Sequence, residues 1–438
     1  MNLKHLIPLS LALLVSCSGG DIPTEPMNIL FVGNSYTFGR GTAALQYNAS
    51  NVEDLTLAFN NLSPQSGSSP VGTGVAPTPC KDTSGAVGCY SPKPWGGVPG
   101  IFKALADEIG LNYTVAISAR SAATLRGQFL NTADPAWDLR GNLASKKWDV
   151  VVLQGQSDEP LPRAKSKNGN PLSFSTYANQ IAQYIQNGDA AETTEAAIFG
   201  SLMNCTNPVT ATPPGAGLTS TNCNTARSIP KNAFANPAAK LYLMQTWARP
   251  DMVEPHKCVD DDKSTMVGAP IVDPTCSNGT NGSKLTGMNN LYYTAKASTS
   301  ENLADMTNDL FAATASAAAN SKKSTGESRF TGVVPVGNAF QRALNQGIAK
   351  SSGFYKADGT YVDLGSEMNL WFFDYTHASV YGYYLSALVS FGTISGLDPT
   401  RFGGRDKAAS DLKIAQKDAA ALQEIAKQTI LAAGFSLR

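Results

Sequence analysis

Short apolar runs, each long enough for one buried strand, recur along the chain and are separated by amphipathic stretches. We expect strands near Ile29, Val115, Val151, Ile198 and Leu241. Between them, the segment 174–185 places its apolar residues at helical spacing. Alternating strands and helices predict an α/β fold, in which helices cover both faces of a parallel sheet and make three layers.

Three segments rich in Pro, Gly, Ser, Thr and Asn interrupt this alternation, near residues 61–95, 204–237 and 250–289. Such composition is typical of surface loops, so we expect insertions into a single domain that spans residues 27–438. Loops at the carboxyl ends of parallel strands frame the ligand crevice, and these insertions would therefore shape access to it. The tail 406–433 is rich in Ala, Lys and Gln and predicts a closing surface helix.

The chain begins with a targeting segment. Lys4 precedes a short apolar run, and a small residue stands directly before Cys17. This arrangement resembles a bacterial lipoprotein signal, which implies removal of residues 1–16, lipid attachment to Cys17 and a flexible tether over 17–26. Ser18 resembles the residue found in lipoproteins sent to an outer membrane, on its periplasmic or surface face. The alternative is an ordinary secretory signal and a secreted protein.

Six cysteines remain after Cys17, an even number in an exported chain, which predicts disulfides. Many pairings are possible, but neighbours within each insertion favour three local pairs: Cys80–Cys89, Cys205–Cys223 and Cys258–Cys276. The chain has no Cys-x-x-Cys pattern, and the acidic run at 260–262 lacks the full spacing of a calcium loop. We therefore expect no bound metal.

The composition is that of one medium-large globular domain, with 438 residues, 42% hydrophobic residues and a formal net charge of zero. No long run of Lys or Arg is present, so we expect no nucleic-acid partner. Beyond the targeting segment, no apolar stretch of about eighteen residues predicts a membrane-spanning helix. No obligate protein partner is evident, and the lipid anchor is the expected contact with a membrane.

Ser35 is the first candidate for chemistry, because it closely follows the apolar run 27–32. Gly33 and Asn34 tolerate a tight turn that would expose the hydroxyl in the crevice of an α/β sheet. A serine hydroxyl becomes a nucleophile when a neutral imidazole takes its proton and a carboxylate orients the imidazole. Alternatively, these residues only end the strand with a turn.

Only three histidines could supply that base, and His5 lies in the targeting segment. His256 lies in a proline-rich, charged stretch that predicts a surface loop. His377 follows Asp374 by three residues and precedes apolar residues at helical spacing. We expect the first turn of a buried helix to hold His377, either as a catalytic base or as a capping residue.

The segments 33–37, Gly-Asn-Ser-Tyr-Thr, and 374–377, Asp-Tyr-Thr-His, resemble two sequence blocks of the SGNH or GDSL-like hydrolases, in a lipoprotein-like branch. The resemblance implies a flavodoxin-like, three-layer α/β fold. It also implies that Ser35 is the nucleophile, His377 the general base and then acid, and Asp374 the orienting carboxylate.

Two further segments, 240–250 and 333–340, resemble the same branch. The first of them predicts a buried strand that ends at Trp-Ala-Arg-Pro. Trp247 and Arg249 could face the crevice, but we interpret Trp247 as a core residue and Arg249 as an ion-pair partner.

The second block of the family supplies a glycine N–H to the oxyanion hole, beside the N–H of the nucleophile, here Ser35. The corresponding segment 118–125 contains no glycine. The backbone N–H of any residue can serve if the turn is right, and Ser121 and Ala122 are the candidates.

The third block supplies an asparagine side chain, and the chain has glutamines there instead. In the segment 154–158, Gln-Gly-Gln-Ser-Asp, either Gln154 or Gln156 could donate its amide N–H to the oxyanion hole. The alternative is that both only satisfy polar backbone groups of the loop.

The resemblance implies an esterase that forms an acyl-enzyme on Ser35 and needs no cofactor. The third block also resembles that of some carbohydrate acetylesterases, which favours an acetylated glycan as substrate, with an acyl lipid or a polyester as alternatives. Acyl transfer to a sugar hydroxyl on the same site is another possible reaction. The missing second-block glycine leaves open a non-catalytic binding protein anchored at the cell surface.

Overall fold

The computed structural model describes residues 25–56, 94–130, 138–257, 291–362 and 367–438. Its centre is a six-stranded sheet in which every neighbouring pair of strands is parallel. In spatial order the strands are β2 (Val52–Asp54), β3 (Tyr113–Ala119), β1 (Met27–Gly33), β4 (Val150–Leu153), β7 (Lys240–Met244) and β8 (Phe330–Val334). The predicted α/β fold with a parallel sheet is therefore confirmed.

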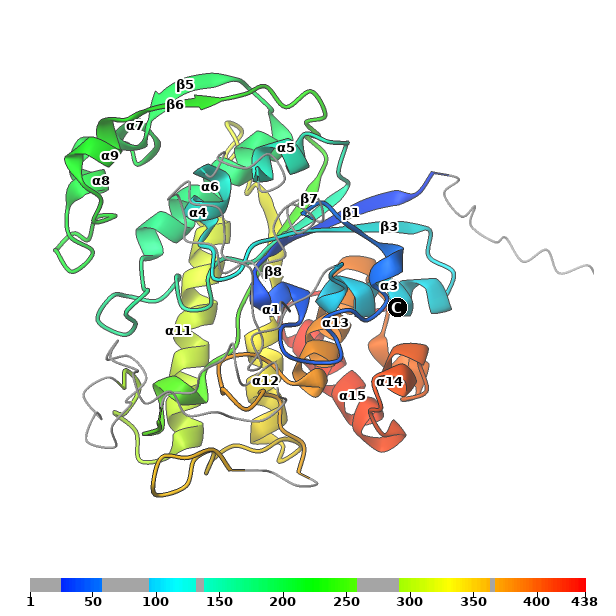
Figure 1. The fold of residues 1–438 in the computed structure, drawn as a ribbon. Coiled ribbons are helices and arrows are strands. Elements are labelled where there is room, and N and C mark those ends of the chain that lie inside the picture. Colours follow the sequence, from blue (N-terminus) through cyan, green and yellow to red (C-terminus); the bar gives the residue numbers. More distant parts are fainter. Residues whose placement is uncertain (1–24, 57–93, 131–137, 258–290, 363–366) are drawn as a thin grey trace, which may run out of the picture.

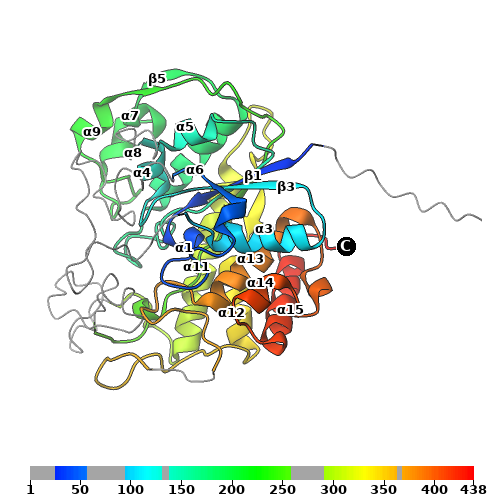
Figure 2. The same ribbon diagram turned by 45° about the vertical axis from the view of Figure 1, so that its right-hand side comes forward.

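Helices cover both faces of the sheet. Successive side chains of a strand point to opposite faces, so an apolar strand needs a covering layer on each face. In β1, Ile29 and Phe31 belong to one apolar core, whereas Leu30 and Val32 belong to the other. The first core is completed by α3 (Gly97–Glu108), α12 (Val336–Asn345), α13 (Val380–Ser395) and α15 (Gln416–Ala432). The second is completed by α4 (Leu125–Leu130), α5 (Leu139–Leu143) and α6 (Pro171–Gln186). Figures 1 and 2 show these two helical layers on either side of the strands.

The long helix α11 (Thr299–Asn320) joins β7 to β8 and packs against both α6 and α12. Ser298 begins it with a capping box, in which its side chain accepts the Glu301 N–H and Glu301 accepts the Ser298 N–H. Leu303, Met306 and Leu310 belong to the first apolar core, and the segment 317–318 belongs to the second, so one helix is shared by both sides of the molecule.

The strand order places a ligand crevice beside β1. Without the short edge strand β2, the order along the sheet is second, first, third, fourth and fifth in chain sequence, as in flavodoxin-like folds. The chain leaves β1 for β3 on one side and later returns to β4 on the other, which is a topological switch point. Gly33 pairs with Ala119, and Val32 pairs with Leu153, so the three strands end side by side.

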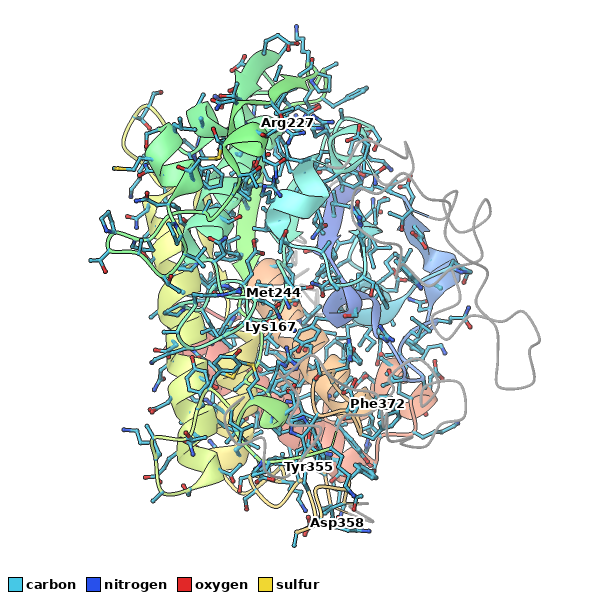
Figure 3. The ribbon with its side chains drawn as sticks, turned by 60° about the vertical axis from the view of Figure 1, so that its left-hand side comes forward. Lys167, Arg227, Met244, Tyr355, Asp358 and Phe372 are labelled. Atoms are coloured by element: carbon cyan, nitrogen blue, oxygen red, sulfur yellow. A yellow bond between two sulfur atoms is a disulfide. The ribbon has the colours of Figure 1, made fainter. Side chains whose placement is uncertain are left out.

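An arm outside the central sheet contains the second predicted insertion. The antiparallel strands β5 (Ala191–Thr194) and β6 (Ala226–Ile229) flank three short helices: α7 (Glu195–Ile198), α8 (Leu202–Thr206) and α9 (Ser220–Asn224). A disulfide joins Cys205 to Cys223, which confirms that predicted pair. Figure 3 shows Arg227 in this arm, at the opposite end of the molecule from Asp358.

Two predictions of secondary structure are wrong, one in the arm and one at the carboxyl end of the chain. Ile198 lies in helix α7 and not in a strand, because the Thr194 side chain accepts the Ala197 N–H and starts a helix there. The tail 406–433 is not one surface helix but two, α14 (Lys407–Asp411) and α15, separated by a turn in which Lys413 has a φ of 62°. Helix α15 buries one apolar face against α13 and exposes residues such as Lys417 and Glu424, so its predicted surface position holds.

Other predictions lie outside the described residues: the signal 1–16, Cys17 and most of its tether, the acidic run 260–262 and four cysteines, Cys80, Cys89, Cys258 and Cys276. Within the described residues, no helix is long and apolar enough to cross a membrane.

Candidate active site

Ser35 lies directly at the switch point, two residues after the end of β1. It is the first residue of a one-turn helix, α1 (Ser35–Phe38), whose N-cap is Asn34. The Asn34 Oδ1 accepts the Tyr36 N–H at 3.1 Å, which closes the turn. Gly33 is required here, because a Cβ atom at this position would lie 1.9 Å from the Thr37 Oγ1. The sequence thus folds into a tight turn that presents the serine hydroxyl.

The structure brings Ser35, His377 and Asp374 together in one hydrogen-bonded chain. The Ser35 Oγ lies 2.9 Å from the His377 Nε2, and the His377 Nδ1 lies 2.6 Å from the Asp374 Oδ2. All three residues are buried, with exposed fractions of 6%, 5% and 8%. This arrangement can pass the serine proton to the imidazole while the carboxylate holds the ring in one orientation.

Asp374 is held in the ionised form that such an arrangement needs. Burial alone would raise the pKa of the Asp374 carboxyl, but the facing His377 ring lowers it. The Asp374 Oδ1 also accepts the backbone N–H groups of Thr376 and His377, each at 2.9 Å, and these bonds lower the pKa further. The net effect is a pKa well below the ordinary value of an aspartic acid.

The turn that carries the aspartate and the histidine is strained and firmly braced. Tyr375 has a φ of 52°, which non-glycine residues rarely adopt. The Thr376 carbonyl accepts hydrogen bonds from the Tyr36 hydroxyl at 2.6 Å and from the Trp247 Nε1 at 3.1 Å. His377 lies in this turn, before α13 begins at Val380, so the prediction that the first helical turn holds it is wrong.

Helix α13 fastens the nucleophile instead. The Tyr383 hydroxyl donates a hydrogen bond to the Ser35 carbonyl at 3.1 Å. Trp247 is fully buried and stacks between the rings of Tyr36 and Phe340, with centroids 4.0 and 4.9 Å away. Its predicted place in the core is confirmed.

Arg249 links the histidine turn to the third-block loop. Its guanidinium donates to the Thr376 Oγ1 and the Ser157 Oγ, each at 3.2 Å. It also forms ion pairs with Asp251 and, at 3.6 Å, with Asp158. Burial would lower the pKa of Arg249, but the two carboxylates raise it well above its ordinary value. The predicted ion-pair role is confirmed.

Two backbone N–H groups near Ser35 are available for an oxyanion. Among the described residues, neither the N–H of Ser35 nor that of Ala122 donates a hydrogen bond. Ala122 has a φ of 54°, a left-handed conformation that glycine adopts most readily. Ala122 therefore adopts the backbone conformation typical of a glycine, although the segment 118–125 contains no glycine. Ser121 lies beside it, nearly buried, whereas Ala122 is exposed.

The two glutamines of the third block have different surroundings. Gln154 is fully buried, and its Oε1 accepts the Asn34 N–H at 3.1 Å and the Thr37 hydroxyl at 2.9 Å. Its amide nitrogen donates to the Gly155 carbonyl. Gln156 is partly exposed, and its Nε2 lies 3.3 Å from the Ser157 Oγ. Its Oε1 accepts the Asp158 N–H at 3.3 Å, and its side chain also hydrogen-bonds with the Asp158 carboxyl. Gln154 therefore supports the nucleophile turn, and the Gln156 amide is the one less engaged by the protein.

His256 is separated from this chemistry but is not on the surface as predicted. It is buried, its Nδ1 lies 2.9 Å from the Glu254 carbonyl, and its ring stacks on Tyr355. Burial lowers the pKa of His256. Proline and charge in this segment suggested exposure, but the partly buried Glu254 accepts the backbone N–H groups of Gly353 and Phe354, which ties the segment to the neighbouring chain.

Sequence reasoning missed two residues that connect the loops of the site. The Asn34 Nδ2 donates to the Gly155 carbonyl at 3.0 Å and to the Ala123 carbonyl at 3.4 Å, which joins the three loops that leave β1, β3 and β4. Glu159 lies buried behind the third block. Glu159 follows a polar run, Gln-Gly-Gln-Ser-Asp, so the sequence carries no local signal that its side chain is buried.

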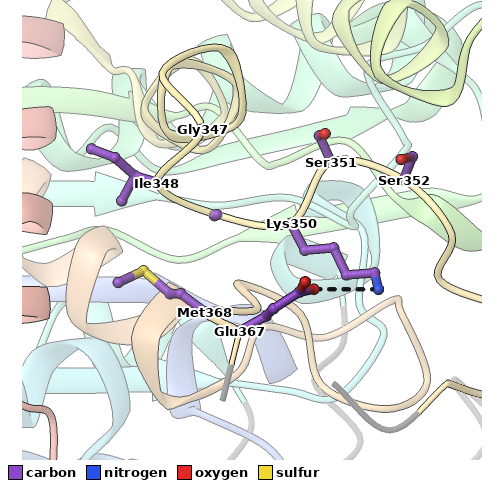
Figure 4. Close-up of a pocket in the computed structure, with 8 residues that line it drawn as sticks. Gly347, Ile348, Lys350, Ser351, Ser352, Glu367 and Met368 are labelled. Atoms are coloured by element: carbon purple, nitrogen blue, oxygen red, sulfur yellow. Dashed lines mark ion pairs between the residues drawn. The ribbon is translucent and has the colours of Figure 1, made fainter. Parts of the chain in front are cut away.

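No metal site accompanies these residues: the described part of the chain has no group of three or more His, Cys, Asp or Glu that could hold an ion. Figure 4 shows a separate pocket, lined by residues 347–352, Glu367 and Met368. Its volume is about 430 Å³. Lys350 and Glu367 face one another there at 3.6 Å. No residue of the triad lines this pocket.

Comparison with known proteins gives weak structural similarity and no match of sequence. No protein-family model and no curated protein sequence matches the chain. A DUF4886 family protein from Bacteroides uniformis is 13% identical with a TM-score of 0.40, and the match covers 93% of this chain and 95% of that one.

Two further solved structures are similar at lower TM-scores. A candidate SGNH hydrolase from Slackia heliotrinireducens is 16% identical with a TM-score of 0.32, covering 84% of this chain and all of that one. The native aryl esterase of M. smegmatis is 13% identical with a TM-score of 0.21, covering 61% and 94%. At these TM-scores we take no activity from any of the three proteins.

Proposed function

We propose that this chain is a serine ester hydrolase, with Ser35 as nucleophile, His377 as general base and Asp374 as the orienting carboxylate. One observation carries the proposal: the unbroken chain of hydrogen bonds from the Ser35 Oγ through both ring nitrogens of His377 to Asp374. Its position at the switch point, where α/β sheets bind ligands, supports the same conclusion.

The reaction begins when the Ser35 Oγ attacks the ester carbonyl carbon and its proton passes to the His377 Nε2. The bond from carbon to the leaving alcohol then breaks, and the imidazolium gives its proton to that alcohol. The acyl group stays on Ser35. Water, deprotonated by the same nitrogen, releases the carboxylic acid and restores the serine. No cofactor takes part in any of these steps.

The negative oxygen that forms on the carbonyl is stabilised by three donors in this proposal. They are the backbone N–H groups of Ser35 and Ala122 and the side-chain amide of Gln156. The free N–H groups, the left-handed conformation of Ala122 and the weak engagement of Gln156 support this assignment. Ser121 and Gln154 are the less favoured donors, since Gln154 already serves the nucleophile turn.

For the substrate we propose an acetyl ester of a carbohydrate, on the strength of the third-block resemblance. Acyl lipids, polyesters and acyl transfer to a sugar hydroxyl are the alternatives. A screen of purified protein against p-nitrophenyl esters, acetylated glycans and polyesters, with and without a sugar acceptor, separates them. Release of free acetate from a glycan without an acceptor is the expected result.

We further propose that the enzyme works at the bacterial cell envelope, attached by lipid at Cys17. The signal-like segment before Cys17 supports this location. In a bacterial host, Cys17→Ala is expected to move the protein from the membrane fraction to the soluble fraction without loss of esterase activity. An unchanged distribution would favour a secreted protein with an ordinary signal.

The central test is Ser35→Ala. The side chain of Ser35 bonds only to His377 among the described residues, so the variant is expected to fold and to lose p-nitrophenyl ester hydrolysis. It should also lose labelling by a fluorophosphonate, which in the natural protein is expected on the peptide that contains Ser35. The matched control is Ser390→Ala, another buried serine, which bonds only within α13 and should keep full activity. Unchanged turnover in folded Ser35→Ala would favour a binding protein on this fold.

A further inference from the structure

The two loops that carry the proposed oxyanion donors follow different strands, so a connection between them is needed to fix their relative position. One follows β3 and includes Ala122; the other follows β4 and includes Gln156. The carboxyl group of Glu159 supplies that connection. Its Oε2 accepts the N–H of Leu125, the first residue of α4, at 3.2 Å, and the N–H of Gln156 at 3.3 Å.

The surroundings of Glu159 are built closely around this carboxyl group. Glu159 is only 1% exposed. Gly155 leaves room for the carboxyl group, because a Cβ atom there would lie 2.8 Å from the Glu159 Oε2 and 3.0 Å from the Phe174 ring. A larger residue at position 155 would push the carboxyl group away from its present place beside the Gln156 N–H.

The same surroundings disfavour a negative charge. Within the described residues, the Glu159 Oε1 is buried without a hydrogen-bond partner. The neighbouring charge is the carboxylate of Asp158, which is paired with Arg249, while Arg126 on α4 pairs with Glu195 instead. Burial raises the pKa of Glu159 to about 8, against the smaller lowering effect of the two N–H groups.

We propose that Glu159 is a positioning residue that fixes the spacing of the two oxyanion loops, and that it does so as a neutral carboxylic acid. The inference rests on the proposed esterase function. Ionisation of Glu159 would place a negative charge behind the Gln156 N–H, next to the site where the transition state itself becomes negative. Activity should therefore decrease when Glu159 loses its proton.

The test is the pH dependence of kcat and KM from pH 6 to 9.5, measured with p-nitrophenyl acetate. The background hydrolysis seen with Ser35→Ala is subtracted at each pH. The natural enzyme is expected to lose at least fivefold in kcat above pH 8. Glu159→Gln keeps one acceptor oxygen and cannot ionise, so it should stay within about threefold at pH 7 and lose the alkaline decrease. Glu159→Ala should lose tens of fold in kcat at every pH with little change in KM.

A matched control separates this effect from the loss of any buried carboxyl group. Glu254 also accepts two backbone N–H groups, those of Gly353 and Phe354, away from the oxyanion loops, and Glu254→Gln should keep the natural profile. Ionisation of Tyr36 or Tyr383 does not account for a decrease of kcat above pH 8, because burial raises the pKa of both hydroxyl groups.

The outcomes distinguish this inference from the proposed function. If Ser35→Ala is inactive but Glu159→Gln keeps the alkaline decrease, or folded Glu159→Ala keeps natural kcat, only the role of Glu159 is wrong. If the natural protein hydrolyses no ester, or Ser35→Ala hydrolyses as well as it does, both proposals are overturned. If Glu159→Ala does not fold, the profile of Glu159→Gln decides.

Discussion

The two glutamines of the third block should respond to truncation in opposite ways. Gln154→Ala removes the acceptor of two buried groups, the Asn34 N–H and the Thr37 hydroxyl. A buried donor left without a partner destabilises the fold by about 1–3 kcal/mol, so the two together should lower the free energy of unfolding by about 2–6 kcal/mol. That is a large part of the roughly 5–15 kcal/mol by which a typical domain is stable.

Gln156→Ala should leave stability within about 0.5 kcal/mol, because the side chain is partly exposed and its contacts are 3.3 Å long. If its amide stabilises the oxyanion, kcat should instead fall by roughly 100- to 1,000-fold, which corresponds to about 2.7–4 kcal/mol in the transition state.

The assay combines equilibrium denaturation in guanidinium chloride with kcat at saturating p-nitrophenyl ester, for both variants and for Gln154→Met. The methionine fills the space of the glutamine and offers only a weak thioether acceptor, so it separates the lost hydrogen bonds from the effect of a cavity. A Gln156→Ala enzyme with kcat within a few-fold of the natural value would refute the assigned donor. Natural stability of Gln154→Met would refute the structural role of Gln154.

Three further predictions concern charge and covalent structure. Because the folded-state pKa of Glu159 is raised from 4.5 to about 8, the unfolded state releases its proton first, and folding stability should fall as pH rises between these values. Denaturation from pH 5 to 8 measures the free energy of unfolding of the natural protein and of Glu159→Gln. The difference between the two free energies should change by up to about 1.4 kcal/mol per pH unit, and a difference that does not change with pH would exclude the raised pKa. Arg249→Met leaves Asp251 buried without its cation and should destabilise by about 3–5 kcal/mol, measured by denaturation, whereas a loss below 1 kcal/mol would contradict the pairing. Replacing Cys205 and Cys223 by serine should expose the arm to limited proteolysis and leave kcat unchanged, since the arm lies apart from helix α1 (Figure 1). A reduced kcat would indicate that the arm contributes to the site.

The sequence predicted the elements whose pattern is strictly local. The strands at Ile29, Val115, Val151 and Leu241 lie where expected, because each is a short apolar run buried on both faces of the sheet. Ile198 was misassigned because its apolar character belongs to a short capped helix, and the edge strand β8 was not predicted at all.

The candidate site was predictable in its residue types but not in its connections. Ser35, Asp374 and His377 could be selected because few histidines were available and the spacing was suggestive. Nothing local distinguishes Gln154 from Gln156, since the difference arises from how closely the nucleophile turn approaches Gln154. The left-handed backbone of Ala122 is likewise imposed by its tertiary surroundings, because alanine has no intrinsic preference for it.

The hydrogen bond between Ser35 and His377 spans 342 residues of sequence, and that between Ser35 and Tyr383 spans 348. Contacts of such high sequence separation carry a large loop-closure cost, so we expect them to form late in folding. A chain emerging amino end first carries its nucleophile from the beginning but has no base until α13 docks against α3. Recovery of esterase activity during refolding should therefore report the last assembly step, and it should lag behind the recovery of secondary structure. Ester hydrolysis at this site would therefore require a chain that has folded almost completely.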